Sequence, residues 1–155
     1  MQELTDQERA NQATVRRMFE VFNTGDLAVI DEIVDENLLS HNPHPGTANN
    51  REGLKMQIRF LRGTFPDARF VEDDIVVDGD KAFLRWSMTA TDRGGYMGHA
   101  PTGREITHHG QEFLRLRDGV IVEHHGEESN LEFLEKLGVG PGARGAPAGA
   151  ADQRA

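Results

Sequence analysis

Cysteine is absent from the 155 residues of this chain. This absence excludes disulfides, thiolate nucleophiles and cysteine-ligated zinc sites, because each of them requires a thiol. Cysteine-free sequences suit reducing compartments, where disulfides do not persist, so we expect a cytoplasmic protein.

Long apolar runs and an excess of positive charge are also absent. Apolar runs cover only a few residues, which is too short for a membrane span, and the opening MQELTDQERA is too polar for a signal peptide. Asp and Glu number 26 against 17 Lys and Arg, so the net charge is −9. We therefore expect no membrane segment and, without a basic stripe to offset phosphate charge, no nucleic-acid partner.

Helical periodicity dominates the first half of the chain, whose length suits one domain with a single core. Thr5-Asp6-Gln7-Glu8 has the form of a capping box, and the apolar spacing after it predicts a helix from Thr5 to about Phe22. Similar spacing predicts helices over residues 27–34 and 51–65, with an extended segment over 38–41 between them.

Beyond Pro66 the apolar residues alternate as in β-strands. Strands are predicted over residues 70–77 and 81–91, and a second capping box, Ser129 to Glu132, predicts a closing helix. This order predicts an α+β fold, in which a strongly bent antiparallel sheet wraps over the N-terminal helices and leaves a conical pocket. Residues 1–138 are expected to form the domain, and residues 139–155, rich in Gly, Pro and Ala, a disordered tail.

A hairpin over residues 104–129 carries four of the seven histidines, with several glutamates among them. Two pairings compete at its turn, which includes Asp118-Gly119. A two-residue turn pairs Arg117 with Val120, whereas a three-residue turn with Gly119 in the left-handed position pairs Leu116 with Val120. We favour the second, because the last loop position is where a glycine with positive φ is expected.

The three-residue turn sets Glu112 opposite His124 and His108 opposite Glu128 on one face of the hairpin. An acid beside an imidazole in an apolar cavity can exchange a proton with an enolisable substrate, so we take these four as candidate catalytic residues. The alternative is a pair of structural ion pairs. Zinc bound by His108, His124 and Glu112 is not expected, because adjacent His-His pairs place one ring on each face. A one-residue slip would exchange the faces; the residues expected on the outer face include His109, Glu123 and His125.

The pocket walls are expected to come from this hairpin face and from the apolar face of the preceding strand. Trp86 is either a core residue or a platform for a ligand, and His41 either lines the pocket mouth or caps the adjacent loop. His44 and His99 are expected in solvent-facing loops. The expected substrate-binding residues are His41, Trp86, Met88, Leu114, Phe22 and Tyr96.

Four segments, FNTGDLAVIDEIV, YMGHAPTGREI, FLRLRDGVIVEHH and LEFLEKLG, together resemble the SnoaL-like polyketide cyclase family over about residues 12–138. The resemblance implies a cone-shaped fold shared with limonene epoxide hydrolase and ketosteroid isomerase. It also implies ring closure by intramolecular aldol chemistry on a hydrophobic polyketide-like molecule, without metal or organic cofactor. A homodimer is implied as well, and we expect it to form through the outer sheet face that carries Phe113 and Ile121.

The sequence departs from the family pattern at one position. Family members commonly read EHW followed by an acid, the proposed general acid/base, whereas this chain has His125 and Gly126 there. Glu128, or the pair of Glu112 and His124, would have to replace that acid. We therefore expect a cofactor-independent cyclase or tailoring enzyme of natural-product biosynthesis, acting by aldol chemistry or by a cycloaddition driven by substrate folding. The alternatives are an epoxide hydrolase or hydroxylase on the same fold, which would need a water-activating Asp/Arg set, and a non-catalytic module that binds a small molecule.

Overall fold

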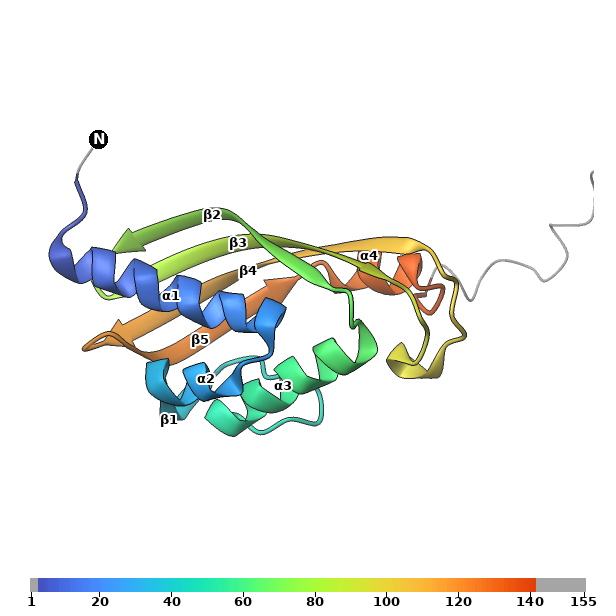
Figure 1. Ribbon diagram of the computed structural model, residues 1–155, viewed down its shortest axis with the longest axis horizontal. Helices are drawn as coiled ribbons and strands as arrows, with labels where there is room; N and C mark the ends of the chain where they lie inside the picture. The colour runs from blue at the N-terminus through green and yellow to red at the C-terminus, as the bar shows by residue number, and fades with distance from the viewer. Residues whose placement is uncertain (1–2, 142–155) are drawn as a thin grey trace, which may run out of the picture.

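The computed structural model describes residues 3–141 and places three helices on one side of a twisted sheet (Figure 1). A long loop with one short 3-10 turn, η1, joins the third and fourth strands, and a fourth helix follows the sheet. The elements in chain order are α1 Asp6–Thr24, α2 Leu27–Ile33, β1 Val34–Ser40, α3 Arg51–Thr64, β2 Arg69–Asp78, β3 Lys81–Thr91, η1 Tyr96–Gly98, β4 Glu105–Arg117, β5 Val120–Glu128 and α4 Asn130–Lys136.

Helices α1 and α3 begin at side chains that satisfy their first free N–H groups. The Thr5 hydroxyl accepts from the N–H of Glu8 at 3.2 Å, and the Glu8 carboxylate accepts from the N–H of Thr5 at 2.7 Å, which completes the predicted capping box. At α3, Asn50 Oδ1 accepts from the N–H of Gly53 at 3.1 Å. The second predicted capping box is wrong, because the Ser129 hydroxyl donates to the carbonyl of His109 at 3.0 Å instead of capping α4.

The five strands form one sheet in the order β1-β5-β4-β3-β2. Its pairs are antiparallel except for β1 and β5, which run parallel. We expected an antiparallel sheet throughout, but β1 enters from α2 rather than from a hairpin, so connectivity does not fix its direction. A register shift between Glu72 and Asp74 adds a bulge to β2, and bulges increase the bend and twist of a sheet.

The central hairpin turn differs from the one predicted. Arg117 pairs with Val120, so Asp118 and Gly119 form a two-residue turn with φ of 52° and 74°. The extra residue enters later, where Arg115 pairs with Glu123 but the next pair is formed with Ile121. An extra residue in the turn and an extra residue in β5 place the same side chains on the inner face of the hairpin, so the predicted faces are correct from Glu123 onward. The residue directly opposite each position, however, differs from the predicted one by two.

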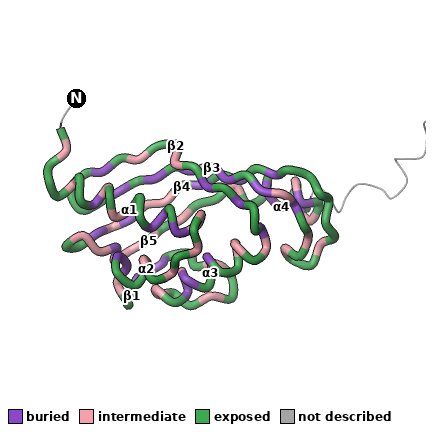
Figure 2. The backbone as a smooth tube through the Cα atoms, in the orientation of Figure 1, coloured by how far each residue is buried: buried purple, intermediate pink, exposed green. Residues whose placement is uncertain are grey.

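The core lies between the helices and the face of the sheet that they cover (Figure 2). As predicted, the even-numbered residues of β3 are buried, from Ala82 to Ala90. Ile121 was predicted on the outer surface, and this is wrong, because the bulge after it turns its side chain into the core, where it is 1% exposed.

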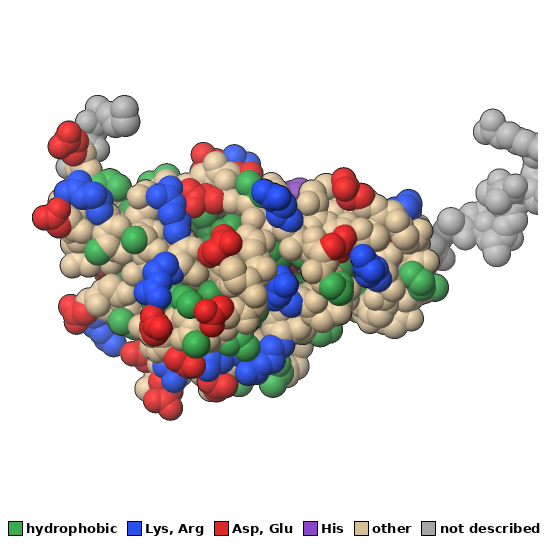
Figure 3. Space-filling view, in the orientation of Figure 1, with side chains coloured by type: hydrophobic (Ala, Val, Ile, Leu, Met, Phe, Trp, Pro, Cys, Tyr) green, Lys and Arg blue, Asp and Glu red, His purple; other side chains and the backbone are tan. Residues whose placement is uncertain are grey.

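The ends of the domain and its surface add three observations. No helix within residues 3–141 is long and apolar enough to cross a membrane. Val139 packs against the core, one residue beyond the expected domain end, and residues 142–155 of the predicted tail lie outside the described residues. On the face shown in Figure 3, Lys and Arg side chains lie among Asp and Glu side chains, so acidic charge there is interspersed with basic charge.

Candidate active site

A cavity of about 270 Å³ opens between the helices and the inner face of the sheet. Its polar wall comes from β4 and β5, and the remaining walls are mostly apolar and aromatic. Such a combination suits a hydrophobic ligand that is oriented by a few polar groups. The aromatic residues that line it are Phe19, Phe22, Phe70, Trp86, Tyr96 and Phe133.

Glu112 on β4 and His124 on β5 form the first acid–imidazole pair in this cavity. Oε2 of Glu112 is hydrogen-bonded to Nε2 of His124, and Oε1 accepts from the indole N–H of Trp86 at 2.9 Å. The hydroxyl of Ser40, at the end of β1, lies 3.3 Å from Nδ1 of His124. The side chains of Glu112 and His124 are only 13% and 18% exposed, so a proton held there is largely shielded from bulk water.

Gly126 makes room for this pair. It is the residue directly opposite Glu112 in the β4–β5 ladder, and a Cβ at position 126 would lie 2.7 Å from Oε2 of Glu112. The side-chain amide of Asn42 holds the backbone of Gly126: its Oδ1 accepts from the N–H at 2.9 Å, and its Nδ2 donates to the carbonyl. The Glu112 carboxylate therefore fills the space that a side chain at position 126 would take.

His108 and Glu128 form a second pair with the same layout. Nε2 of His108 lies 3.0 Å from Oε2 of Glu128, and the Ser129 hydroxyl lies 3.4 Å from Nδ1. His108 is 7% exposed and its ring packs at 4.3 Å on that of Phe133, whereas the Glu128 side chain is 30% exposed. His108 and His124 thus each have a carboxylate at Nε2 and a serine near Nδ1.

Trp86 lies between the two pairs. A Cβ on Gly110 would lie 2.6 Å from the indole, so only glycine permits this close approach between β3 and β4. The indole donates to Glu112 on one side and meets the ring of His108 edge-on at 5.5 Å on the other. His108 and Glu112 lie four residues apart on one strand, about 13 Å between Cα atoms, and the indole fills much of that interval.

A buried network holds the loop that brings Tyr96 to the cavity. The carboxylate of Asp92 is fully buried; it accepts from the Thr102 hydroxyl at 2.6 Å and from the N–H of Gly94 at 3.0 Å, and pairs with His99 at 2.7 Å. Burial alone would raise the pKa of Asp92, but these hydrogen bonds outweigh it and lower the pKa to about 2. His99 was predicted to face solvent, and this is wrong, because its ring is 5% exposed within the network. Burial, and secondarily the charge of Glu128, raises the pKa of Tyr96.

The structure brings together all four candidate catalytic residues around one cavity. The contacts are diagonal rather than directly opposite, because the bulge moved each cross-strand partner by two residues. Among the expected substrate-binding residues, Phe22, Trp86, Met88 and Tyr96 line the cavity. His41 and Leu114 do not: Ser40 pairs with His124 and shares its inward face, so the next residue, His41, lies on the outer face, and Leu114 is fully buried in the core.

Sequence reasoning missed several residues of the site. His44 was expected in a solvent-facing loop, but it is half-buried and lines the cavity. Asn42 holds the backbone of Gly126 only because β1 docks beside β5, and no periodicity in the sequence predicts that docking. The Asn42-Pro43 dipeptide indicated a turn, and it was the only available signal.

The fold and the cavity together define a class of protein: an α+β cone in which a bent sheet holds acid–imidazole pairs inside an apolar pocket. Residues 12–137 match the SnoaL-like polyketide cyclase family, and the chain belongs to that family. No curated protein matches the chain significantly.

Solved structures agree with this assignment. IdmH of Streptomyces antibioticus, a proposed polyketide cyclase, is 34% identical with a TM-score of 0.74, over 83% of this chain and 99% of that one. A proposed polyketide cyclase of Bacillus cereus is 27% identical with a TM-score of 0.77, over 88% of this chain and 87% of the other. AclR of Streptomyces galilaeus, a proposed hydroxylase, is 26% identical with a TM-score of 0.73, over 84% and 97%.

Proposed function

We propose that this protein is an enzyme of natural-product biosynthesis that closes a ring in a hydrophobic, polyketide-like molecule by acid–base chemistry, without a cofactor. The observation that carries the proposal is the presence of two Glu–His pairs on one wall of an aromatic cavity. The family assignment supports the substrate class, and the residues support the reaction type.

Glu112 is the proposed general base. Nε2 of His124 is hydrogen-bonded to Glu112 and Nδ1 lies 3.3 Å from the Ser40 hydroxyl, so the imidazole is held in place beside the carboxylate. The carboxylate takes the proton of a C–H bond next to a substrate carbonyl, and the electron pair of that bond forms an enolate. Trp86 holds Oε1, so the carboxylate is fixed before the substrate arrives.

His108 with Glu128 is the proposed general acid. The enolate carbon forms a new C–C bond with a second carbonyl carbon of the same molecule, and the electrons of that carbonyl move to its oxygen. The resulting alkoxide takes a proton from the His108 imidazolium, which becomes a neutral imidazole beside the Glu128 carboxylate. Solvent then exchanges protons with both pairs and restores the starting state.

Glu112 can supply the acid–base group that the family usually carries at position 126. The resemblance places the family's usual acid at Gly126, and the Glu112 carboxylate occupies the space that the side chain there would fill. We therefore propose that the acid–base function moved from β5 to the facing residue of β4. Among the described residues that line the cavity there is no Asp and no Arg, which disfavours a water-activating set of the epoxide-hydrolase kind.

The test measures enolisation directly, with α-tetralone as a slowly exchanging aromatic ketone. Hydrogen–deuterium exchange at its α-carbon in D₂O is followed by NMR with the wild-type protein and with Glu112→Gln. Because Gln keeps the shape but cannot carry the proton, the catalysed exchange rate should fall by about 10²- to 10⁴-fold. A circular dichroism melt confirms that the variant is folded.

Glu105→Gln is the matched control, since Glu105 lies on the same strand but is exposed on the outer face. Its exchange rate should equal that of the wild type. Equal rates for Glu112→Gln and Glu105→Gln would refute the acid–base proposal. If in that case Trp86→Ala still altered ring closure of a linear polyketide, substrate folding by the aromatic walls would be the better account.

A further inference from the structure

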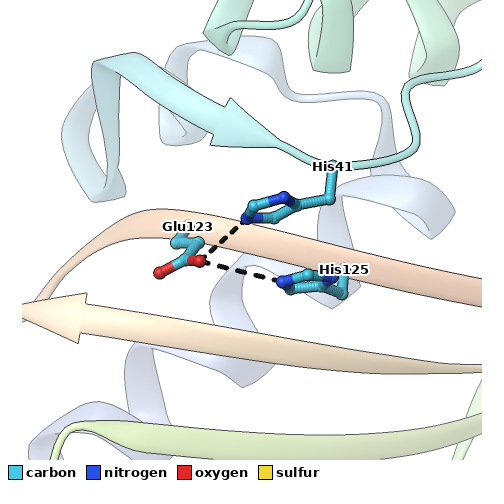
Figure 4. A group of neighbouring side chains, drawn as sticks. All are labelled: His41, Glu123 and His125. Carbon is cyan, nitrogen blue, oxygen red and sulfur yellow. Dashed lines mark hydrogen bonds and ion pairs between the residues drawn. The ribbon is translucent and has the colours of Figure 1, made fainter.

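A cluster of histidine and glutamate side chains lies on the outer face of the sheet, opposite the cavity. It consists of His41, just beyond β1, with Glu123 and His125, two residues apart on β5 (Figure 4). Both imidazoles approach the same carboxylate oxygen: Oε1 of Glu123 lies 2.8 Å from Nε2 of His41 and 3.7 Å from Nε2 of His125. One ligand atom from each residue lies within 4.8 Å of the other two.

These separations are close to those around a bound zinc ion. With Zn–N and Zn–O bonds of about 2.1 Å in tetrahedral geometry, ligand atoms lie about 3.4 Å apart. The observed 2.8 Å and 3.7 Å lie on either side of that value. The rings of His41 and His125 stack with centroids 3.7 Å apart and planes 10° apart, which keeps both imidazoles on the same side of Glu123, and both rings would rotate out of this stack to direct their nitrogens to one ion.

Arg115 fixes the carboxylate from the other side. Its Nε donates to Oε2 of Glu123 at 3.0 Å, and its Nη1 pairs with Asp80 at 3.0 Å. Oε2 is thereby occupied and Oε1 is left facing the two histidines. A partner that orients a ligating carboxylate in this way is typical of metal sites.

The site is open to solvent. The side chains of His41, Glu123 and His125 are 37%, 25% and 47% exposed, so water can complete the coordination of an ion. His124 lies between the two β5 ligands in sequence and points to the cavity on the opposite face. An ion held by its neighbours therefore cannot touch a molecule in the cavity.

We propose that His41, Glu123 and His125 bind a divalent transition-metal ion, zinc in the first place. Two imidazole nitrogens and one carboxylate suit zinc, copper or nickel, whereas Mg²⁺ and Ca²⁺ prefer oxygen ligands throughout. The ion joins the end of β1 to β5, the one parallel pair in the sheet. Its role is to hold the strand edge, and it does not take part in the proposed ring closure.

The test is titration of the full chain, stripped of metal with EDTA, with Zn²⁺ in an isothermal calorimeter. The wild type should bind one ion per chain, and His41→Gln, Glu123→Gln and His125→Gln should each weaken binding about tenfold or more, because each loses one of three protein ligands. Zn²⁺ should also raise the melting temperature of the wild type but not of these variants. Melts in EDTA show whether each variant is folded.

His109→Gln is the matched control. His109 is an exposed histidine of β4 that faces a single carboxylate, that of Glu132 at 3.8 Å, and lies outside the cluster. It should bind Zn²⁺ as the wild type does. The proposal is overturned if His109→Gln weakens binding as much as His41→Gln does, or if the wild type binds no more tightly than the three ligand variants.

Discussion

A Cβ atom at position 126 would lie 2.7 Å from Oε2 of Glu112, closer than non-bonded atoms approach, so the Glu112 carboxylate occupies the space that a side chain at Gly126 would need. The two residues face each other across the β4–β5 ladder. A side chain at position 126 and a carboxylate at position 112 are therefore alternatives, and this relationship can be tested by exchanging them.

The exchange uses Gly126→Asp, alone and combined with Glu112→Ala. Gly126→Asp alone should lower α-tetralone exchange, because the new side chain displaces Glu112 and puts two carboxylates side by side. Glu112→Ala alone removes the base. The double variant carries the acid on β5 with room to fit, and should exchange about tenfold faster than Glu112→Ala, a partial recovery of a general base. If the double variant exchanged deuterium no faster than Glu112→Ala, the proposal that an acid at position 126 can replace the one at position 112 would be contradicted.

Alanine at the same position isolates the steric effect. Gly126→Ala should destabilise the fold by no more than about 1 kcal/mol in urea unfolding, the low end of the usual cost of overpacking, because the atom that it crowds is the end of the Glu112 side chain, which can move. Gly63→Ala is the control, because Gly63 lies in α3, where an added Cβ would meet no atom within 4 Å, and the variant should gain about 0.5–1 kcal/mol. Equal effects at the two positions would show that Gly126 is not crowded.

The faces of the hairpin were predictable from the sequence, but the pairing was not. Strand alternation fixes which residues share a face once the number of extra residues is known. One extra residue was correctly inferred, yet it enters β5 near Val122 rather than the turn at Gly119. A two-residue turn of this kind needs positive φ at both of its residues, and Asp118 adopts a φ of 52°. A glycine at position 119 alone is compatible with either turn, so it did not distinguish them.

Long-range placement explains the remaining errors. His41 lies on the outer face because β1 docks beside β5 with Ser40 opposite His124, and no local pattern around residue 41 indicates which strand it will join or in which register. His99 is buried because Asp92, seven residues earlier, accepts hydrogen bonds within a loop whose glycines and prolines predicted only irregular structure. The start of α1, in contrast, depends on neighbours in sequence and was predicted correctly from Thr5 and Glu8, whereas the Ser129 hydroxyl bonds to the distant His109 instead of capping α4.

The pair of Asp92 and His99 should make the stability of the fold depend on pH. A hydrogen bond to the carbonyl of Tyr96, opposed by burial and assisted by Asp92, raises the pKa of His99 above 6.5. A raised histidine pKa stabilises the fold fully below pH 6.5, and this stability is lost as the pH rises through the folded-state value. The lowered pKa of Asp92 adds stability above pH 3.8 that is lost as the pH falls towards about 2.

Thermal melts of the wild type and His99→Gln from pH 5 to pH 9 check the histidine contribution. The wild type should be more stable than His99→Gln at acidic pH, and the difference should shrink as the pH rises. Asp92→Ala should cost about 3–5 kcal/mol at neutral pH, because it leaves the donors of this buried network without their acceptor. A difference between wild type and His99→Gln that is constant, or that grows with pH, would contradict the prediction.

We propose a homodimer through the outer sheet face, at a place other than the one first expected. Ile121 is buried, so the apolar surface there comes mainly from β2 and β3, where Val76 pairs directly with Phe83 and the two are 60% and 36% exposed. Phe113 extends this surface onto β4, next to Phe83 in the ladder. Exposed apolar residues gathered on one sheet face are typical of an interaction site. The cluster of His41, Glu123 and His125 lies at β1 and β5, and His125 is the ladder partner of Phe113, so the cluster borders this surface while a second copy centred on β2 and β3 need not cover it.

Light scattering after size-exclusion chromatography tests this surface. The wild type should have twice the chain mass of 17.2 kDa at micromolar concentration. The double variant Val76→Glu/Phe83→Glu should run as a monomer, because two carboxylates per chain would have to be buried without partners in the contact. Met56→Glu is the control: Met56 is 50% exposed on α3, away from the sheet face, and its replacement should leave the mass of the dimer unchanged. A wild type that is monomeric, or a double variant that remains dimeric, would show that this face of β2 and β3 does not join two copies of the chain.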